Sequence, residues 1–460
     1  MRTPNADKIL SALHTMTDDL TSKLQLRGVH PFQHLRMPGF RWPELRIGEK
    51  VARIPVVQGG MGVGISLSGL ASAVANVGGI GVIAANAIGM IEKDYFADGR
   101  AANLRALRNE IRAARKKTNG LIGVNIMVAV NDFHALLDVA IEEQVDIVFM
   151  GAGLPVKGIP VDRMRANGVK AAPIVSSARA AELIFRMWKK SYGDVPDAVV
   201  CEGPRAGGHL GFSVDQIDDP EYQLDHLVPE IVDALRPYEE EFGRDIPLIA
   251  AGGIYTGEDI HTVMTLGAAA VQMATRFVAT HECDAAQEFK QAYVECTADQ
   301  IGLIKSPVGM PGRAIRNQFI ENSERGDAAS FRCAWKCLAS CDAESAKYCI
   351  SVALNNARKG RMDRGFVFVG SNAYRVTEIV PVAALTAELA EGYRETARAV
   401  AAARLEGMVK RIKVLRRRLE RLGGRRSEQV AVRLEALRHQ IVETLAESWR
   451  MLTGQLREGI

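Results

Sequence analysis

Eight short apolar runs recur between residues 53 and 273, and most of the intervals between them have helical periodicity. Regular alternation of strands and helices predicts a parallel sheet with right-handed crossovers. Eight units favour a closed (β/α)8 TIM barrel, an α/β fold, over an open doubly wound sheet, which remains the alternative. The predicted strands are residues 53–58, 79–84, 121–127, 146–150, 172–175, 198–201, 247–250 and 270–273. The clearest helical patterns are residues 67–77, 101–117, 133–143 and 178–190.

The predicted sixth strand ends in a glycine pair followed by a histidine. Gly207, Gly208 and His209 come shortly after the apolar run at residues 197–200. Glycines let a flat ligand approach the backbone, and an imidazole can take or give a proton near neutral pH. The pattern is typical of the rim of an active site, although a tight turn with a hydrogen-bonded histidine would look the same.

The next two predicted strands also end in small residues. The run at 246–251 leads into Gly252 and Gly253, and the last predicted strand is followed by Ala274 and Thr275. In a (β/α)8 barrel, the loops after strands seven and eight form a phosphate site with their backbone N–H groups and a helix N-terminus. The sequence therefore predicts a phosphate-bearing ligand at this end of the barrel.

Six segments together resemble one enzyme family. They are residues 55–62, 78–83, 123–127, 206–211, 250–254 and 271–277, in the family's order. The chain resembles, over roughly residues 40 to 320, the nitronate monooxygenase family, once called 2-nitropropane dioxygenases, which also includes flavin-dependent enoyl-acyl-carrier-protein reductases. The resemblance implies a barrel that holds FMN without a covalent link.

The resemblance also implies a set of cofactor-binding residues at the ends of the barrel strands. Backbone groups would meet the flavin ring near residue 60, and Asn125 would bind the ring or the ribityl chain. The glycines at 252 and 253, with Ala274 and Thr275, would bind the phosphate. The full set is Gly60, Met61, Asn125, Ser176, Gly207, Gly208, Gly252, Gly253, Gln272, Ala274 and Thr275.

His209 matches the family's active-site histidine, which implies a role as catalytic acid or base. We expect an FMN-dependent oxidoreductase that oxidises or reduces a small substrate at the flavin. An enoyl-thioester reductase that uses NAD(P)H is the alternative, and an electron-transfer subunit is another. The chain departs from the family in residues 202–209, where the loop before the glycines is longer. This departure puts the position of Glu202 in doubt, and Arg205 is either a substrate contact or a solvated side chain.

Four of the seven cysteines fall within one short segment. Their spacing, C-x3-C-x3-C-x7-C, differs from the C-x2-C pairs of zinc ribbons. Clustered thiols in an intracellular chain favour metal or cluster binding over disulfides, and we expect a [4Fe–4S] cluster. Zinc and unligated packing along one helix face remain open. The proposed ligands are Cys333, Cys337, Cys341 and Cys349.

Four segments are expected along the chain. They are an N-terminal helical cap at 1–45, an FMN-binding barrel at 46–325, a Cys-rich segment at 326–380 packed near the barrel, and a C-terminal helical hairpin at 381–460 that turns at Gly423 and Gly424. The Pro/Gly-rich loop at 305–314 and the strand-like run at 365–375 either cover the cofactor or serve as plain connectors.

Charge and hydropathy narrow the class of protein. The net charge of +4 gives no argument for nucleic-acid binding. No apolar run of about 20 residues predicts a transmembrane helix, and the first residues lack a signal-peptide core. We therefore expect a cytoplasmic homo-oligomer that acts on a small molecule. NAD(P)H and an acyl carrier protein or a redox partner are further expected partners. The basic face near residues 410–421 is either a solvated surface of a packed helix or a site for an acidic partner, such as the carrier protein, or for an anionic membrane surface.

Overall fold

The computed structural model describes residues 42–327, 331, 333, 335–338, 340–420, 433, 436 and 440. The chain divides into two compact units, one at residues 44–389 and the other at residues 1–43 with 390–460. The expected N-terminal helical cap lies outside the described residues, as do the turn and nearly all of the second helix of the expected C-terminal hairpin.

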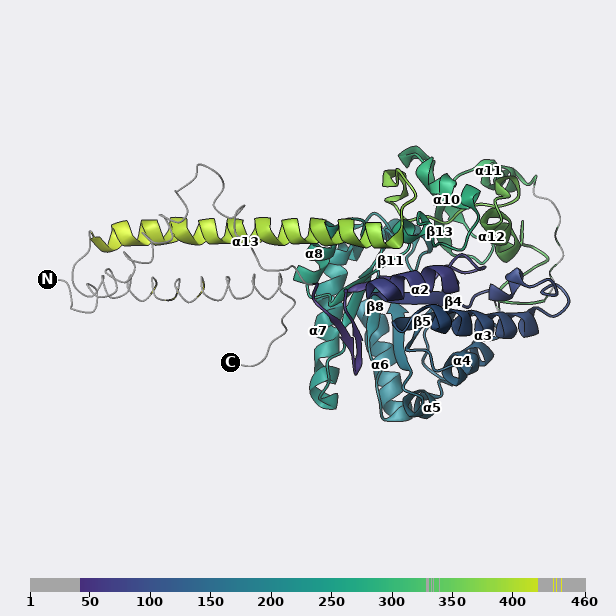
Figure 1. Cartoon of the computed structure of the whole chain (residues 1–460), viewed down its shortest axis with the longest axis horizontal. Coiled ribbons are helices and arrows are strands. Elements are labelled where there is room, and N and C mark those ends of the chain that lie inside the picture. The colour runs from purple at the N-terminus through teal and green to yellow at the C-terminus, as the bar shows by residue number, and fades with distance from the viewer. Residues whose placement is uncertain are drawn as a thin grey trace. The chain divides into compact units, whose positions relative to one another are not determined.

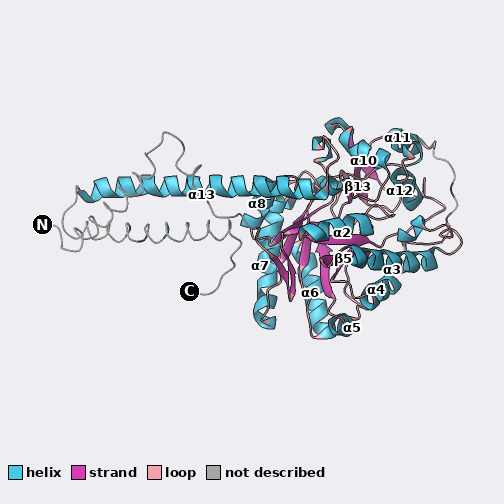
Figure 2. Ribbon diagram, in the orientation of Figure 1, coloured by secondary structure: helices cyan, strands magenta, loops and turns pink. Residues whose placement is uncertain are grey.

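Eight parallel strands close into a barrel in the first unit, which confirms the predicted fold (Figures 1 and 2). Two predicted runs, at 121–127 and 270–273, coincide with strands of the structure. The strands in order around the barrel are β3 (Val56–Gln58), β4 (Ile80–Ala84), β5 (Leu121–Met127), β6 (Ile147–Gly151), β7 (Lys170–Val175), β8 (Val199–Glu202), β10 (Leu248–Ala251) and β11 (Ala270–Met273).

A hairpin that sequence reasoning missed fills one end of the barrel. Strand β1 (Leu45–Ile47) pairs antiparallel with β2 (Lys50–Ala52). Its apolar side chains belong to the same buried cluster as Ile80 and Ile147, which stand at the first positions of β4 and β6. The amino ends of the strands are therefore closed by apolar packing, which leaves the carboxyl ends for a ligand.

Helices cover the outside of the barrel in Figure 1. Side chains fix where several of them begin. The carboxylate of Asp284 accepts hydrogen bonds from the backbone N–H groups of Leu67, Gly69 and Leu70 and so caps the first of these helices. The helices are α2 (Ser68–Val77), α3 (Gly99–Lys117), α4 (Phe133–Glu142), α5 (Val161–Ala166), α6 (Ala178–Tyr192), α7 (Leu224–Phe242), α8 (Gly257–Thr265) and α9 (Thr275–Val278).

The chain after the barrel builds a second layer with its own core. We call residues 301–370 the capping segment. Its strands β12 (Ile301–Lys305) and β13 (Pro311–Ile315) form a sheet with the two-residue strand β9 (Gly208–His209). Figure 1 shows β13 beside α10 (Gln287–Val294), α11 (Gln318–Arg325) and α12 (Ile350–Arg358). The buried side chains of this layer form a separate cluster of Ile304, Ala314, Ile320, Tyr348, Ile350, Ala353 and Phe366.

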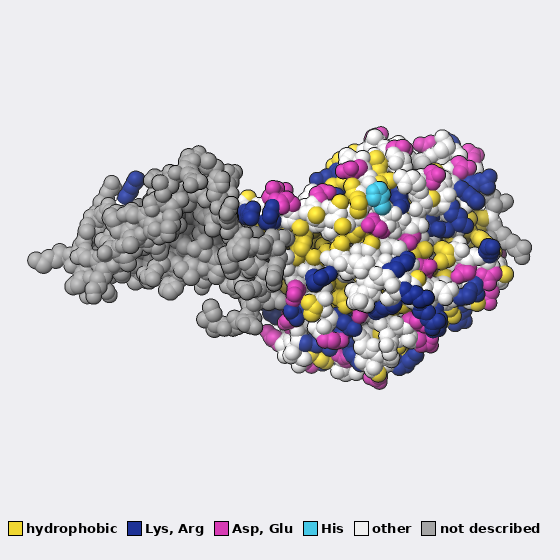
Figure 3. Space-filling view, in the orientation of Figure 1, with side chains coloured by type: hydrophobic (Ala, Val, Ile, Leu, Met, Phe, Trp, Pro, Cys, Tyr) yellow, Lys and Arg dark blue, Asp and Glu magenta, His cyan; other side chains and the backbone are white. Residues whose placement is uncertain are grey.

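The long helix α13 (Val382–Glu420) confirms a helical C-terminal extension. Its first two turns are tied to the barrel, because Val382 donates its backbone N–H to Glu282 and Arg276 pairs with Glu388 at 2.6 Å. None of the described helices combines the length and the apolar character that a bilayer-crossing helix needs. Basic and acidic side chains are interspersed on the described surface in Figure 3.

Candidate active site

A cavity of about 280 Å³ lies at the carboxyl ends of the barrel strands. This is the end at which (β/α)8 barrels bind their ligands. Residues after β3, β8, β10 and β11 line it, as does Asn125 of β5. The capping segment contributes Phe368, Val369 and Gly370, so the cavity has a floor from the barrel and a wall from the second layer.

The structure brings together nearly all of the residues predicted for the flavin site. The exception is Ser176, which is not part of the cavity lining; a Cβ placed on Gly211 would come within 2.3 Å of its Oγ. The predicted residues that line the cavity are Gly60, Met61, Asn125, Gly207, Gly208, His209, Gly252, Gly253, Gln272, Ala274 and Thr275.

Three of these glycines adopt backbone conformations that favour glycine. Gly208 has φ +82°, Gly252 has φ +92° and Gly253 has φ +83°. A Cβ on Gly208 would meet no atom within 4 Å, so a side chain there would extend into open space beside the cavity. The glycine therefore keeps that space free and leaves its backbone accessible to a ligand.

His209 is held by the capping segment rather than by a barrel helix. Through β9, it pairs with Gly312 of β13. Its Nε2 atom lies 2.7 Å from Oγ of Ser306, and its ring packs edge-on to Phe368 with 5.1 Å between the ring centroids. Burial lowers the pKa of His209 to about 4, so the imidazole is neutral at physiological pH and can accept a proton.

The loop that leads into β9 is fixed by a buried arginine. Nη1 of Arg313 donates hydrogen bonds to the carbonyl oxygens of Pro204 and Ala206, at 2.6 and 2.7 Å. Because Arg313 belongs to β13, the same strand positions both this loop and His209. The longer loop of this chain is thus an ordered part of the site.

Two charged side chains of this region also face the cavity. Glu202 stands at the end of β8, and burial raises the pKa of its carboxyl to about 7. Arg205 is exposed at the cavity wall and lies against Gly253, where an added Cβ would be 2.9 Å from the Arg205 Cβ. The longer loop therefore leaves Glu202 in the cavity and places a cation beside the predicted phosphate glycines.

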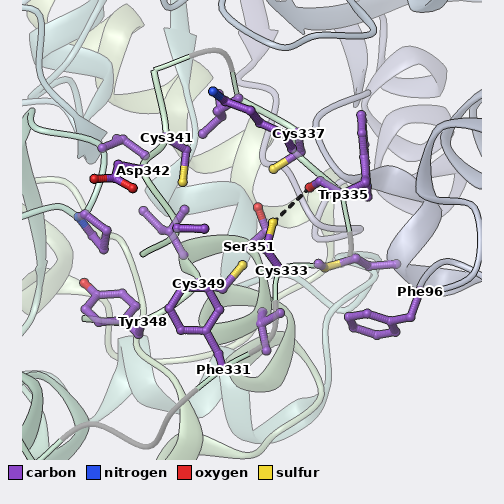
Figure 4. A pocket seen from close by; sticks show the side chains of 18 of the residues that line it. Phe96, Phe331, Cys333, Trp335, Cys337, Cys341, Asp342, Tyr348, Cys349 and Ser351 are labelled. Atoms are coloured by element: carbon purple, nitrogen blue, oxygen red, sulfur yellow. Dashed lines mark hydrogen bonds between the residues drawn. The ribbon is translucent and has the colours of Figure 1, made fainter. Parts of the chain in front are cut away.

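The four clustered cysteines line one second cavity of about 390 Å³ (Figure 4). They do not share a helix face: Cys333, Cys337 and Cys341 lie in loop structure, and Cys349 is the residue before α12. Burial, together with the charges of the other three thiolates, raises the pKa of Cys337 to about 11. The thiols are thus close enough to interact electrostatically.

Contacts to the loop after β5 hold this cysteine segment in place. The backbone N–H of Asn131 donates to the carbonyl oxygen of Cys337 at 3.0 Å, and its side chain donates to that of Lys336 at 2.5 Å. Cys333 Sγ donates to the carbonyl oxygen of Trp335 at 3.2 Å. Across the described residues, no group of three or more His, Cys, Asp or Glu side chains is arranged to hold a metal ion.

Sequence reasoning missed several residues that shape the site. Ser306 and Phe368 fall in the two segments suggested as covers, but no local pattern marked either residue. Tyr293 of α10 also lines the cavity and donates its hydroxyl hydrogen to the carbonyl oxygen of Phe368 at 2.6 Å. Its segment has only an ordinary amphipathic pattern, so nothing in the sequence distinguishes it.

Comparisons with known proteins agree with this geometry. The family model for nitronate monooxygenase matches residues 46–392. A probable nitronate monooxygenase of Staphylococcus aureus is 27% identical over 317 residues, covering 61% of this chain and 80% of the relative. The structure of FabK from Thermotoga maritima superposes with a TM-score of 0.59 at 29% identity, covering 76% of this chain and 95% of that one.

Another relative is named for a different activity. A Mycobacterium tuberculosis enzyme, (3aS,4S,5R,7aS)-5-hydroxy-7a-methyl-1-oxo-octahydro-1H-indene-4-carboxyl-CoA dehydrogenase, is 29% identical over 275 residues, or 60% of this chain. The match spans 66% of that relative's length, just under two thirds. With a family model that matches most of the chain and a closed barrel beneath it, the protein belongs to the nitronate monooxygenase family.

Proposed function

We propose that the chain binds FMN, without a covalent link, in the cavity at the carboxyl ends of the barrel strands. The open space beside Gly208 supports this, because only glycine leaves room there for a flat ring. The left-handed glycines 252 and 253 and the residues after β11 supply backbone groups suited to a phosphate. Bound FMN supplies an acceptor or donor of two electrons.

A cationic side chain lies beside the residues that would bind the phosphate group of FMN. The aliphatic carbons of Arg205 lie against Gly253, so this cationic side chain extends from the loop beside the glycines that would bind the phosphate oxygens. Guanidinium groups form charge-assisted hydrogen bonds with phosphate. We therefore assign Arg205 to the cofactor rather than to the substrate.

The burial of His209 and its contact with Ser306 favour a direction for the reaction. A pKa of about 4 leaves little imidazolium at neutral pH, which suits removal of a proton better than donation. When the Nε2–H group donates to Ser306, the Nδ1 atom is free to accept a proton. His209 thus acts as the base toward a small compound with an acidic C–H bond, for which a nitroalkane is the model substrate.

An acyl thioester is the second candidate substrate. The named substrate of the Mycobacterium tuberculosis relative is a CoA thioester, whose carbon next to the carbonyl is also acidic. The alternative direction is reduction of an enoyl thioester, with NAD(P)H reducing the flavin. In that direction the protonated carboxyl of Glu202, with a pKa of about 7, is the better proton donor in the cavity.

The decisive experiment compares a nitroalkane with its deprotonated form, the nitronate anion. We expect nitroethane to bleach the flavin absorption of the wild type anaerobically, and His209→Gln to lose this reaction. The pre-formed nitronate anion needs no base, so His209→Gln should still react with it. If the variant fails equally with both forms, His209 is not the base. If only NAD(P)H reduces the flavin and an enoyl thioester reoxidises it, the thioester reductase is the correct function.

A further inference from the structure

The pocket around the four cysteines is not used by the proposed flavin chemistry. Its volume is about 390 Å³. Protein interiors are close-packed and contain few voids larger than a water molecule. The four half-buried thiols line this pocket, so they are within reach of a ligand that enters it.

The thiols approach this pocket from several directions. Figure 4 shows the sulfur atoms of Cys333, Cys337, Cys341 and Cys349 turned toward a common space. Three come from loop backbone and the fourth from the residue before α12. Loops can wrap around a compact core in a way that one helix face cannot.

The spacing of the thiols distinguishes between kinds of metal site. A single zinc ion needs all its ligands at about 2.3 Å from one point. The described residues contain no group arranged in that way. A four-iron cluster is different, because each thiolate binds a different iron, so the four sulfur atoms stand apart around a core of several atoms. The four thiols that line this pocket supply the number and kind of ligands that such a cluster needs.

We propose that this pocket is an iron–sulfur site, in which Cys333, Cys337, Cys341 and Cys349 are the four thiolate ligands of a [4Fe–4S] cluster. Soft thiolates select iron–sulfur clusters, and the iron neutralises four thiolates that would otherwise repel one another. Apolar side chains form much of the remaining wall and would shield the cluster from water. They include Met90, Phe96, Val308, Phe331 and Ile350.

The pocket adjoins the flavin cavity. Leu338, Ile350 and Ser351 line both spaces, so side chains of the same three residues form the partition. Ile350 and Ser351 belong to the first turn of α12, directly after Cys349. The cluster would therefore share a wall with the flavin and not occupy a remote surface. This position makes the cluster a neighbour of the proposed redox centre, while its ligands remain independent of the barrel residues that bind FMN.

Metal analysis of the full chain tests the proposal. Protein purified anaerobically should contain about four iron and four acid-labile sulfide per chain and show an electron paramagnetic resonance signal after reduction with dithionite. Cys337→Ser and Cys349→Ser should each lose most of the iron. The matched control is Cys296→Ser, because Cys296 lies outside the pocket and its Sγ donates to the carbonyl oxygen of Thr297, a bond that serine can replace.

Retained FMN and an unchanged circular-dichroism spectrum show that a cysteine variant has folded, so loss of iron cannot be ascribed to loss of structure. As a second route, apo-protein is incubated anaerobically with ferrous iron and sulfide, and uptake should depend on Cys337. One zinc per chain without iron, iron content that is the same in Cys337→Ser as in wild type, or no metal after reconstitution would each overturn the proposal. Iron without FMN would support the cluster while contradicting the proposed flavin site.

Discussion

The Nε2 atom of His209 lies 2.7 Å from the hydroxyl of Ser306, although 97 residues separate them in the chain. The two meet because β9 and β13 pair, with Gly312 opposite His209. The histidine is therefore oriented by the capping segment, while the ligand space beside it belongs to the barrel.

Ser306→Ala should lower turnover by a modest amount. Loss of one hydrogen bond is worth about 1 kcal/mol, so we expect a fall of about 3- to 10-fold in kcat with FMN retained. His209→Gln should lower kcat by about 10²–10⁴-fold, as expected for loss of a general base. Ser323→Ala is the control, because Ser323 is also a buried serine of the capping segment but bonds only within α11. Equal effects of the two serine variants would contradict a positioning role.

Gly208→Leu should abolish FMN binding, because its side chain would extend into the space kept free at the cavity. Gly193→Leu is the matched control. Gly193 also has a positive φ and open space around its Cβ, but it ends α6 outside the cavity. Backbone strain of about 1–2 kcal/mol should be common to both variants. Flavin content after purification and thermal unfolding separate the two effects; loss of flavin in both would make strain the cause.

Arg205→Gln should raise the Kd for FMN by about 10- to 100-fold, the value of a charge-assisted hydrogen bond. Titration of apo-protein followed by flavin fluorescence measures it. Riboflavin has no phosphate, so its affinity should be unchanged. The control is Arg236→Gln, an exposed arginine of α7 paired with Asp233. An unchanged Kd for FMN in Arg205→Gln would mean that Arg205 contacts the substrate or solvent and not the cofactor.

FMN binding should weaken as the pH rises through 7. The pKa of Glu202 is raised to about 7 by burial, so its carboxyl becomes an anion in the cavity above that pH and repels the anionic cofactor. We expect the Kd to rise roughly 5- to 10-fold between pH 6 and 8.5. Glu202→Gln should remove this rise in the Kd for FMN. Glu258→Gln, an exposed position of α8, should keep it. The same pH dependence in all three proteins would assign it to the phosphate instead.

The barrel was predictable because each of its strands leaves a recognisable pattern in its own stretch of sequence. A strand buried on both faces leaves a continuous apolar run, and the helices between the strands have their own period. Strands β5 and β11 were predicted at their observed bounds for this reason. The hairpin of β1 and β2 was not, because six residues of mixed polarity give no such run.

The flavin-cavity lining was predictable where it depends on backbone at strand ends, as at Gly208 and Gly253. The lining could not be predicted where it depends on pairing between segments that are far apart in the sequence. Ser306 lies near His209 because β9 pairs with β13, and no local sequence pattern predicts that pairing. Ser176 shows the converse: its place after β7 is as expected, but its side chain lies beside Gly211 and not in the cavity. The four clustered cysteines line one pocket on loop backbone, which their spacing alone did not indicate, and their role as cluster ligands stays a prediction.

The separate apolar core of the capping segment means that the enzyme consists of a platform and an interchangeable cover. Barrel stability depends on one set of buried residues, and the layer over the flavin cavity depends on another. Substitutions at Phe368 or Val369, which line the cavity and lie outside the barrel core, can therefore alter which molecules reach it without loosening that core. A relative's cover, transplanted as a whole onto this platform, is the natural unit for re-engineering substrate choice.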